Sequence, residues 1–430
     1  MVDIATRVWN HKWKIDPIVR SLIDTDFYKL LMCQSVFRNK PDTQVTFSLI
    51  NRTKSVRLAE LVDENELREH LDHIRSLSLS RGESTWMRGN TFYGKRQMFT
   101  PEFMDWFEKL RLPPYHLEKR EGQYELTFEG SWPEVMLWEI PALAVLMELR
   151  SRAVLNTLRK FELQVLYARA MTKLWEKVER LRGVDGLRIA DFGTRRRHSF
   201  LWQDWCVQAM TERLEGNFVG TSNCLIAKNR DLEAIGTNAH ELPMVYAALA
   251  KDDEALRKAP YDVLSDWHEE HDGNLRIILP DTYGTKGFLD DAPDWLAGWT
   301  GIRIDSGDPA TGAETAIDWW KSRGEDPKQK LIIFSDGLDE EKILSLHKQF
   351  SGRVKASFGW GTLLTNDFRD LTPNNSLAPF SLVCKAVEAN GKPTVKLSDN
   401  PRKAMGPIDQ INRYKDVFGV GDQVEQDIIV

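Results

Sequence analysis

The chain has few cysteines, no long apolar run and no surplus of positive charge. Its four cysteines among 430 residues form no Cys-x-x-Cys pair, which argues against a disulfide scaffold and a structural zinc site and favours a reducing compartment. No stretch approaches about 18 apolar residues and the N-terminus has no signal-peptide core, so we expect no membrane span and a cytoplasmic location. A formal charge of −6 argues against a general nucleic-acid or membrane-surface binder.

Several common catalytic motifs are also missing from the sequence. It contains no GxxxxGK[ST], no GxGxxG, no HExxH and no GxSxG string. Three glycine-rich strings remain: DSGDP, SDG and FGWGT. Each can offer backbone N–H groups to a phosphate at a helix start, although glycine is common in turns and each string alone is weak support.

The second half of the chain alternates short apolar runs with segments that are mostly long enough for a helix. Seven runs end in small polar clusters, at 187–196, 217–223, 233–241, 275–284, 301–309, 330–337 and 354–362. Continuous apolar strands that alternate with helices predict a parallel sheet covered on both faces. Seven in series predict an irregular, TIM-like α/β barrel with its chemistry at the strand ends, and a doubly wound open sheet is the alternative.

The N-terminal part has a different pattern. It predicts a helix over 21–38, a strand over 44–53 and a long helical stretch over 143–181 that forms either one helix or two. The tail 381–399 reads as two strands around Asn390-Gly391, a strong hairpin signal. We therefore predict a second, N-terminal α/β domain (1–135) completed by the returning segment 381–430, and a catalytic α/β-barrel domain (136–380).

Charged residues gather near the predicted strand ends. Carboxylates there could hold Mg²⁺ together with substrate phosphate oxygens. Arginines there could bind phosphate or carboxylate. A solvated helix start is the simpler explanation for part of the run of three arginines at 195–197. The carboxylates are Asp281, Asp305 and Asp336, and the cations are Arg195, Arg196, Arg197, Lys286 and Arg303.

His240 is the strongest single candidate. Small residues precede it in Gly236-Thr237-Asn238-Ala239, so it could face a pocket as base or nucleophile, oriented by an Asp; a half-buried histidine without a role is the alternative. His268 and His271 could pair as metal ligands, but a polar helix end explains them better. Cys224 could be reactive, but a small core residue is the simpler interpretation.

In combination these clusters resemble the nicotinate phosphoribosyltransferases of the type II phosphoribosyltransferase family. The matching strings are TDFYKLLM (25–32), FSLINR (47–52), DFGTRRR (191–197), GTSN (220–223), GTNAHE (236–241), PDTYG (280–284), IRIDSGDP (302–309), FSDG (334–337) and FGWGT (358–362). The resemblance implies the same two-domain α/β fold. It also implies an enzyme of NAD salvage that joins nicotinate to phosphoribosyl pyrophosphate with Mg²⁺, coupled to ATP hydrolysis through a phosphohistidine.

The resemblance also implies roles for particular residues. His240 would accept the phosphoryl group, Asp281 would orient it, and Asp305 would face the nicotinate and ribose side with Arg303 nearby. Ser335, Asp336, Gly359 and Gly361 would receive ribose and phosphate groups. Tyr28 and Phe192 would sandwich the pyridine ring, with Thr194 and Arg195 near the nicotinate carboxylate and phosphate. In this family the tyrosine tends to come from the neighbouring subunit, which implies a homodimer with a shared site.

Other functions stay open at this stage. Type II relatives use nicotinamide or quinolinate instead of nicotinate, and few contacts decide the base. Another barrel enzyme acting on a sugar phosphate, such as an aldolase or isomerase, would need a Lys or Glu rather than His240. A non-catalytic sensor on this scaffold would bind mononucleotide without releasing pyrophosphate.

Overall fold

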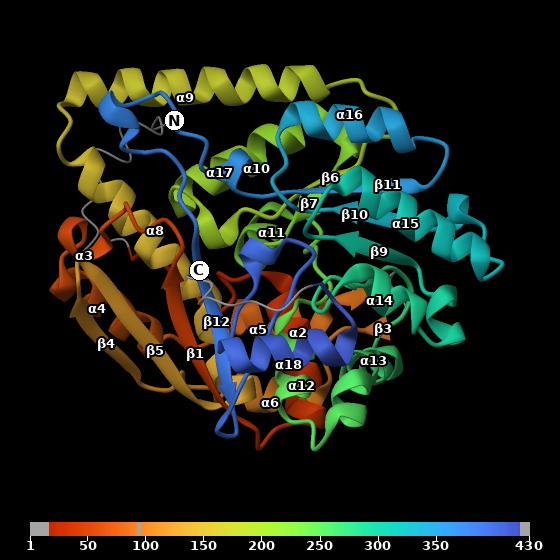
Figure 1. Cartoon of the computed structure of the whole chain (residues 1–430). Coiled ribbons are helices and arrows are strands. Elements are labelled where there is room, and N and C mark those ends of the chain that lie inside the picture. Colours follow the sequence, from red (N-terminus) through yellow and green to blue (C-terminus); the bar gives the residue numbers. More distant parts are fainter. Residues whose placement is uncertain (1–16, 93–95, 422–430) are drawn as a thin grey trace.

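The structure is a computed structural model that describes residues 17–92 and 96–421. It is a mixed α/β fold with an antiparallel sheet on one side and a parallel layer on the other (Figure 1). The strands are β1 Gln44–Asn51, β2 Thr91–Phe92, β3 Arg96–Gln97, β4 Tyr115–Arg120, β5 Gln123–Ser131, β6 Ile189–Asp191, β7 Phe218–Thr221, β8 Ile277–Ile278, β9 Gly301–Ile304, β10 Leu331–Phe334, β11 Lys355–Trp360, β12 Leu382–Ala389 and β13 Lys392–Pro393.

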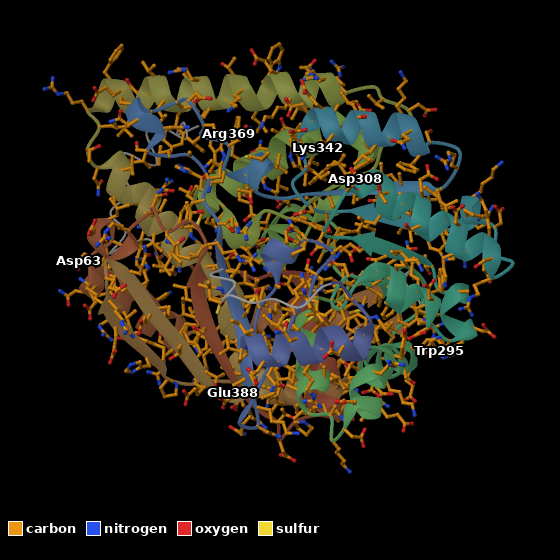
Figure 2. All side chains as sticks on the ribbon, in the orientation of Figure 1. Asp63, Trp295, Asp308, Lys342, Arg369 and Glu388 are labelled. Atoms are coloured by element: carbon orange, nitrogen blue, oxygen red, sulfur yellow. The ribbon has the colours of Figure 1, made fainter. Side chains whose placement is uncertain are left out.

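Helices cover both parts of the molecule. They are α2 Phe27–Asn39, α3 Leu58–Leu61, α4 Glu64–Ser76, α5 Arg81–Gly89, α6 Pro101–Phe107, α7 Trp132–Val135, α8 Glu139–Leu155, α9 Lys160–Leu181, α10 Phe200–Leu214, α11 Cys224–Arg230, α12 Glu241–Ala248, α13 Asp253–Glu270, α14 Thr285–Asp290, α15 Pro309–Ser322, α16 Glu340–Phe350, α17 Thr362–Thr365 and α18 Ile408–Phe418. Capping aspartates start several of them, among them Asp63 on α4 and Asp308 on α15, both labelled in Figure 2. Within the described ranges, none of the helices has the length and apolar character that crossing a membrane requires.

The antiparallel sheet has the order β13-β12-β1-β5-β4. β1 alternates buried and more exposed residues, as a strand with one covered face does. β12 pairs with β1, and β12 and β13 are joined by Asn390 (φ 46°) and Gly391 (φ 76°). Two residues in the left-handed region are what a tight hairpin turn requires. The predicted return of the tail to the N-terminal strands is therefore confirmed.

The parallel layer has the order β7-β6-β11-β10-β9-β8, with every neighbouring pair parallel. The predicted run at 233–241 is not a named strand: it makes one parallel bridge, between Ala234 and Thr221 beside β7. A few residues later the Asn238 side chain donates to the Ile277 carbonyl of β8 at 3.1 Å. This segment thus lies between β7 and β8, the two edge strands of the layer, as the predicted irregular barrel requires.

Gly236 explains why this segment leaves the sheet. A Cβ at Gly236 would lie 2.6 Å from the backbone nitrogen of Tyr28, so only glycine allows α2 to approach so closely.

The mixed α/β fold class is confirmed. The long helical stretch at 143–181 proves to be two helices, α8 and α9. The domain boundaries at 135 and 380 stay a prediction, because one continuous hydrophobic core includes residues of both sheets.

Candidate active site

Several candidate site residues lie where the parallel strands end. Phe192 and Arg195 follow β6, Asp305 follows β9 and Ser335 follows β10. Because the carboxyl ends of parallel strands share one edge, these side chains converge although up to 143 residues separate them.

His240 lies at the start of α12 and is 6% exposed. Its Nδ1 is 2.9 Å from the Thr282 hydroxyl, and its Nε2 is 3.1 Å from Asp305 Oδ2. Burial lowers the pKa of His240, against the opposing effect of Asp281. The ring is therefore mainly neutral near pH 7, with its Nε2 proton pointing to the carboxylate and its Nδ1 accepting from Thr282.

The residue predicted to orient His240 is not its hydrogen-bond partner. Asp281 Oδ1 is 3.7 Å from His240 Nε2, too far for a hydrogen bond, and Asp281 Oδ2 accepts from Ser306 Oγ at 2.6 Å. Asp305 takes the orienting position instead, because β9 ends closer to the imidazole edge. Asp281 belongs to the same cluster but faces the ring from a second direction.

Asp305 is held as a carboxylate. Ser335 Oγ donates to its Oδ1 at 2.6 Å, and Arg303 Nε lies 3.9 Å away. Burial alone would raise the pKa of Asp305, but the Arg303 guanidinium and the hydrogen bond with His240 hold it well below its usual range. Arg303 is itself fixed by donating to the Asn238 carbonyl at 2.9 Å, so it serves the site as a fixed positive charge.

The donor atoms here suit a metal ion that also binds phosphate. His240, Asp281 and Asp305 each offer one possible metal-ligand atom, and these three atoms lie within 4.8 Å of one another. The described part of the chain contains no other group of three such residues. Asp281 Oδ1 is buried and accepts no hydrogen bond. Two carboxylates with a free buried oxygen fit Mg²⁺, which prefers oxygen ligands and keeps places for water and substrate phosphate.

Tyr28 and Arg195 lie together in a second part of the candidate site, and Phe192 packs beside Gly359. Arg195 Cζ is 5.9 Å from the centre of the Tyr28 ring. The chain's own Tyr28 thus lies beside Arg195, and the tyrosine from a neighbouring subunit that the resemblance implied stays a prediction. A Cβ at Gly359 would be 2.2 Å from Phe192, so the absence of a side chain at 359 makes room for that ring. Gly361, two residues on, starts α17.

The three arginines of the DFGTRRR string have different surroundings. Arg197 is fully buried and donates to both carboxylate oxygens of Asp24, at 2.7 and 2.9 Å. The solvated helix start considered above is therefore wrong for Arg197, because the preceding loop turns it into the interior. Arg195 is 41% exposed, and its closest carboxylates, Asp26 and Glu139, are 3.8 and 3.9 Å away. Arg196 Nε donates to the Leu382 carbonyl at 3.1 Å.

Thr194 is fully buried and bonded to its neighbours. Gln203 Nε2 donates to its hydroxyl at 3.0 Å, and the Ser222 hydroxyl lies 3.5 Å away. The Thr194 hydroxyl is thus bonded within the chain, and the substrate contact that the resemblance implied stays a prediction.

Two other sequence candidates lie outside the cluster. His268 accepts from Trp299 Nε1 at 3.1 Å and His271 is buried, and neither belongs to a group that could hold a metal within the described ranges. Cys224 is fully buried, and burial raises the pKa of its thiol, so it is a core residue rather than a nucleophile.

Two lysines of the returning tail had no motif that predicted a place in the site. Lys396 Nζ lies 3.9 Å from Asp281 Oδ2 and is almost buried, which lowers the pKa of Lys396 to about 8 against the opposing effect of Asp281. Lys403 Nζ is 2.8 Å from Asp336 Oδ1 and 3.2 Å from the Asp305 carbonyl. Asp336 thus joins the cluster through Lys403. A small second core, which includes Val395, packs this tail segment against the rest of the chain.

A buried ion network ties the segments of the site together. Lys29 contacts Glu241, which follows His240, and Glu139 Oε2 at 2.6 Å. Glu139 also pairs with Lys385 of β12 at 3.1 Å. The string TDFYK contains this lysine, but its partners are far away in sequence, so only the fold reveals the network.

Comparison with known proteins points to one family. The family model described as the nicotinate phosphoribosyltransferase N-terminal domain matches residues 23–147, and the model of the nicotinate phosphoribosyltransferase family matches residues 187–422. Among solved structures, a nicotinate phosphoribosyltransferase from Vibrio cholerae is 31% identical, with a TM-score of 0.83, 94% of this chain covered and 95% of that chain. A nicotinate phosphoribosyltransferase from Porphyromonas gingivalis is 29% identical, with a TM-score of 0.81, 94% of this chain covered and 100% of that chain.

Proposed function

The chain belongs to the nicotinate phosphoribosyltransferase family, and we propose that it joins nicotinate to phosphoribosyl pyrophosphate, with ATP hydrolysis coupled through a phosphohistidine at His240. The observation that carries this proposal is the imidazole of His240 between Thr282 and Asp305, with a second carboxylate, Asp281, at 3.7 Å. The product, nicotinate mononucleotide, would enter NAD biosynthesis by salvage.

The phosphoryl step follows from the hydrogen bonds of His240. The lone pair of a neutral ring nitrogen attacks the γ-phosphorus of ATP, the N–P bond forms, and the P–O bond breaks with its electron pair leaving on ADP. If Nε2 attacks, its proton passes to Asp305 or shifts to Nδ1, because the Thr282 hydroxyl can accept from Nδ1 as well as donate to it. Water later hydrolyses the phosphohistidine.

The transfer step breaks the C1–O bond of phosphoribosyl pyrophosphate. The electron pair leaves with pyrophosphate, and the pyridine nitrogen of nicotinate attacks C1. Lys396, Lys403 and Arg303 supply positive charge near the leaving group. Asp281 and Asp305 would hold Mg²⁺, which when bound neutralises pyrophosphate charge. Ser335, Asp336, Gly359 and Gly361 are proposed contacts of the ribose and phosphate groups.

The base is proposed to lie between Tyr28 and Phe192, with its carboxylate near Arg195. The partly exposed, loosely paired guanidinium of Arg195 supports this choice, because it can still accept an anionic partner. Thr194 would hold Arg195 in place. A cytoplasmic location and a homodimer with a shared active site remain proposals from the family resemblance.

A pyrophosphate-release assay with phosphoribosyl pyrophosphate and Mg²⁺ tests the proposal. Nicotinate, nicotinamide and quinolinate are compared, each with and without ATP. We expect release with nicotinate that ATP accelerates, and acid-labile, base-stable phosphate on His240. Release without any pyridine base would contradict the transfer reaction.

His240→Ala should abolish the acceleration by ATP and the labelling, while some uncoupled transfer remains. His116→Ala is the matched control, because this histidine is exposed on β4, with 68% of its side chain accessible. Turnover of ATP with His240 unlabelled throughout would defeat the phosphohistidine step and leave the transfer reaction standing.

A further inference from the structure

Arg195 is loosely paired because the carboxylates beside it already have closer partners. Asp26 Oδ2 lies 3.8 Å from Arg195 Nε, while Asp26 Oδ1 accepts from Ser222 Oγ at 2.6 Å. Glu139 Oε1 lies 3.9 Å from Arg195 Nη1, and Lys385 Nζ is nearer to the same oxygen, at 3.1 Å. Two cations therefore face one carboxylate oxygen of Glu139, and the lysine is the closer of them.

Lys385 reaches Glu139 from the returning tail. It stands opposite Ser48 on β12, which pairs with β1 in the antiparallel sheet (Figure 1). Its side chain is 17% exposed, and that of Glu139, the first residue of α8, is 3% exposed. Solvent and salt screen such a covered ion pair only weakly. The position of the Lys385 charge is therefore felt by every other charge around Glu139.

Glu139 is held in its charged form. Burial alone would raise the pKa of its carboxyl, but Lys29, Lys385 and Arg195 hold this pKa below its usual range. Glu139 Oε2 is 2.6 Å from Lys29 Nζ, and Lys29 also contacts Glu241. The two lysines thus balance the two glutamates, so that neither glutamate needs Arg195 as its partner.

We propose that Lys385 is a positioning residue for the nicotinate carboxylate: by holding Glu139 Oε1, it keeps Glu139 from pairing with Arg195. This role rests on the proposed function, in which Arg195 receives the substrate carboxylate. Without Lys385, the Glu139 oxygen would need a shift of only about 1 Å to accept a charged hydrogen bond from Arg195. Arg195 would then be paired within the chain and would bind nicotinate less well. Lys385 acts through Arg195 and needs no contact with the substrate.

A purely structural lysine would behave differently in kinetics. A lysine that only neutralises a buried glutamate would lower stability when removed, and it would change no KM selectively. The positioning role instead raises the KM for nicotinate and leaves the KM for phosphoribosyl pyrophosphate nearly unchanged, because only the carboxylate site loses its free cation. The split between the two KM values therefore separates the two explanations.

Steady-state kinetics with a rescue variant test the proposal. Lys385→Met should raise the KM for nicotinate about 10-fold and keep the KM for phosphoribosyl pyrophosphate within about two-fold. The double variant Lys385→Met/Glu139→Gln should recover most of the affinity for nicotinate, because glutamine carries no charge to attract Arg195. Lys392→Met is the matched control, since Lys392 is an exposed lysine of the same hairpin, on β13. Circular dichroism checks that each variant is folded.

Lys385→Gln covers the case in which the methionine variant does not fold. It keeps a hydrogen-bond donor for Glu139 without the charge, so it should give a smaller rise in the KM for nicotinate. An unchanged KM in the folded single variants, or no recovery in the double variant, would overturn the positioning role.

Arg195→Met distinguishes this role from the proposed function. In the Arg195→Met background, Lys385→Met should raise the KM for nicotinate no further, and a second rise of the same size would overturn the role of Lys385. If Arg195→Met alone leaves that KM unchanged, the proposed carboxylate site fails and the role of Lys385 fails with it. If Arg195→Met raises the KM while the Lys385 variants do not, only the role of Lys385 fails.

Discussion

Arg195 and Arg197 are two residues apart on one short loop, yet their surroundings are opposite. Arg197 is fully buried and makes two hydrogen bonds to Asp24, which Asn223 also contacts at 2.8 Å. Arg195 is 41% exposed and has no carboxylate within 3.7 Å. A buried cation that is closely paired with a buried carboxylate holds the fold together, and an exposed cation with loose partners is available to a ligand.

The same contrast separates other charged residues of the site. Lys29 lies between two buried glutamates and joins α2 to α8 and α12. Lys396 is almost as buried but lies 3.9 Å from its closest carboxylate. Pairing distance, more than burial, thus separates the closely paired Lys29 from Arg195 and Lys396, the loosely paired cations that we propose as substrate contacts.

Removing Arg197 should have the largest effect on stability. Arg197→Met would leave Asp24 buried without its partner, so we expect the free energy of unfolding to fall by about 3–5 kcal/mol. Urea unfolding followed by circular dichroism measures this change. The double variant Asp24→Asn/Arg197→Met should recover much of the loss, since it removes both charges; equal losses in the single and double variants would show that the ion pair is not the cause.

Removing Arg195 should instead change substrate choice. Arg195→Met removes a charged hydrogen-bond donor from the proposed nicotinate carboxylate, so kcat/KM for nicotinate should fall about 10- to 100-fold. Activity with nicotinamide, which lacks that carboxylate, should fall less, and the free energy of unfolding should change by under about 1 kcal/mol. Equal losses with both bases would assign Arg195 to the phosphoribosyl group instead.

The sequence was informative wherever local pattern and fold agree. Apolar runs that end in polar clusters predicted the parallel layer, and Asn390-Gly391 predicted the hairpin that returns to β1. His240 was found because small residues precede it in a string shared with the family. In each of these cases the signal lies within a few neighbouring residues.

The features that could not be predicted from the sequence depend on contacts between segments that are far apart in the chain. Whether Asp281 or Asp305 orients His240 depends on small differences in position, since their carboxylate oxygens lie 3.7 and 3.1 Å from the imidazole Nε2. Lys396 follows a hairpin with no motif of its own and reaches the site only because β12 pairs with β1. The exposure of Phe161 and Trp175 on α9 likewise shows only when the inner face of that helix is known.

Lys396 lies between the two kinds of cation, because it is buried like Arg197 but loosely paired like Arg195. The pH dependence of its charge should have the smallest effect of the three changes. With its pKa lowered to about 8 by burial, against Asp281, it carries its charge below that pH and loses it above. If this charge stabilises a substrate phosphate, kcat/KM for phosphoribosyl pyrophosphate should fall a few-fold as the pH rises from 7 to 9. Lys396→Arg should remove that alkaline decline, because arginine stays charged, whereas Lys392→Arg on exposed β13 should leave it in place. An unchanged decline in Lys396→Arg would mean that another group titrates, and Lys396 would then belong with the buried charges that only build the site.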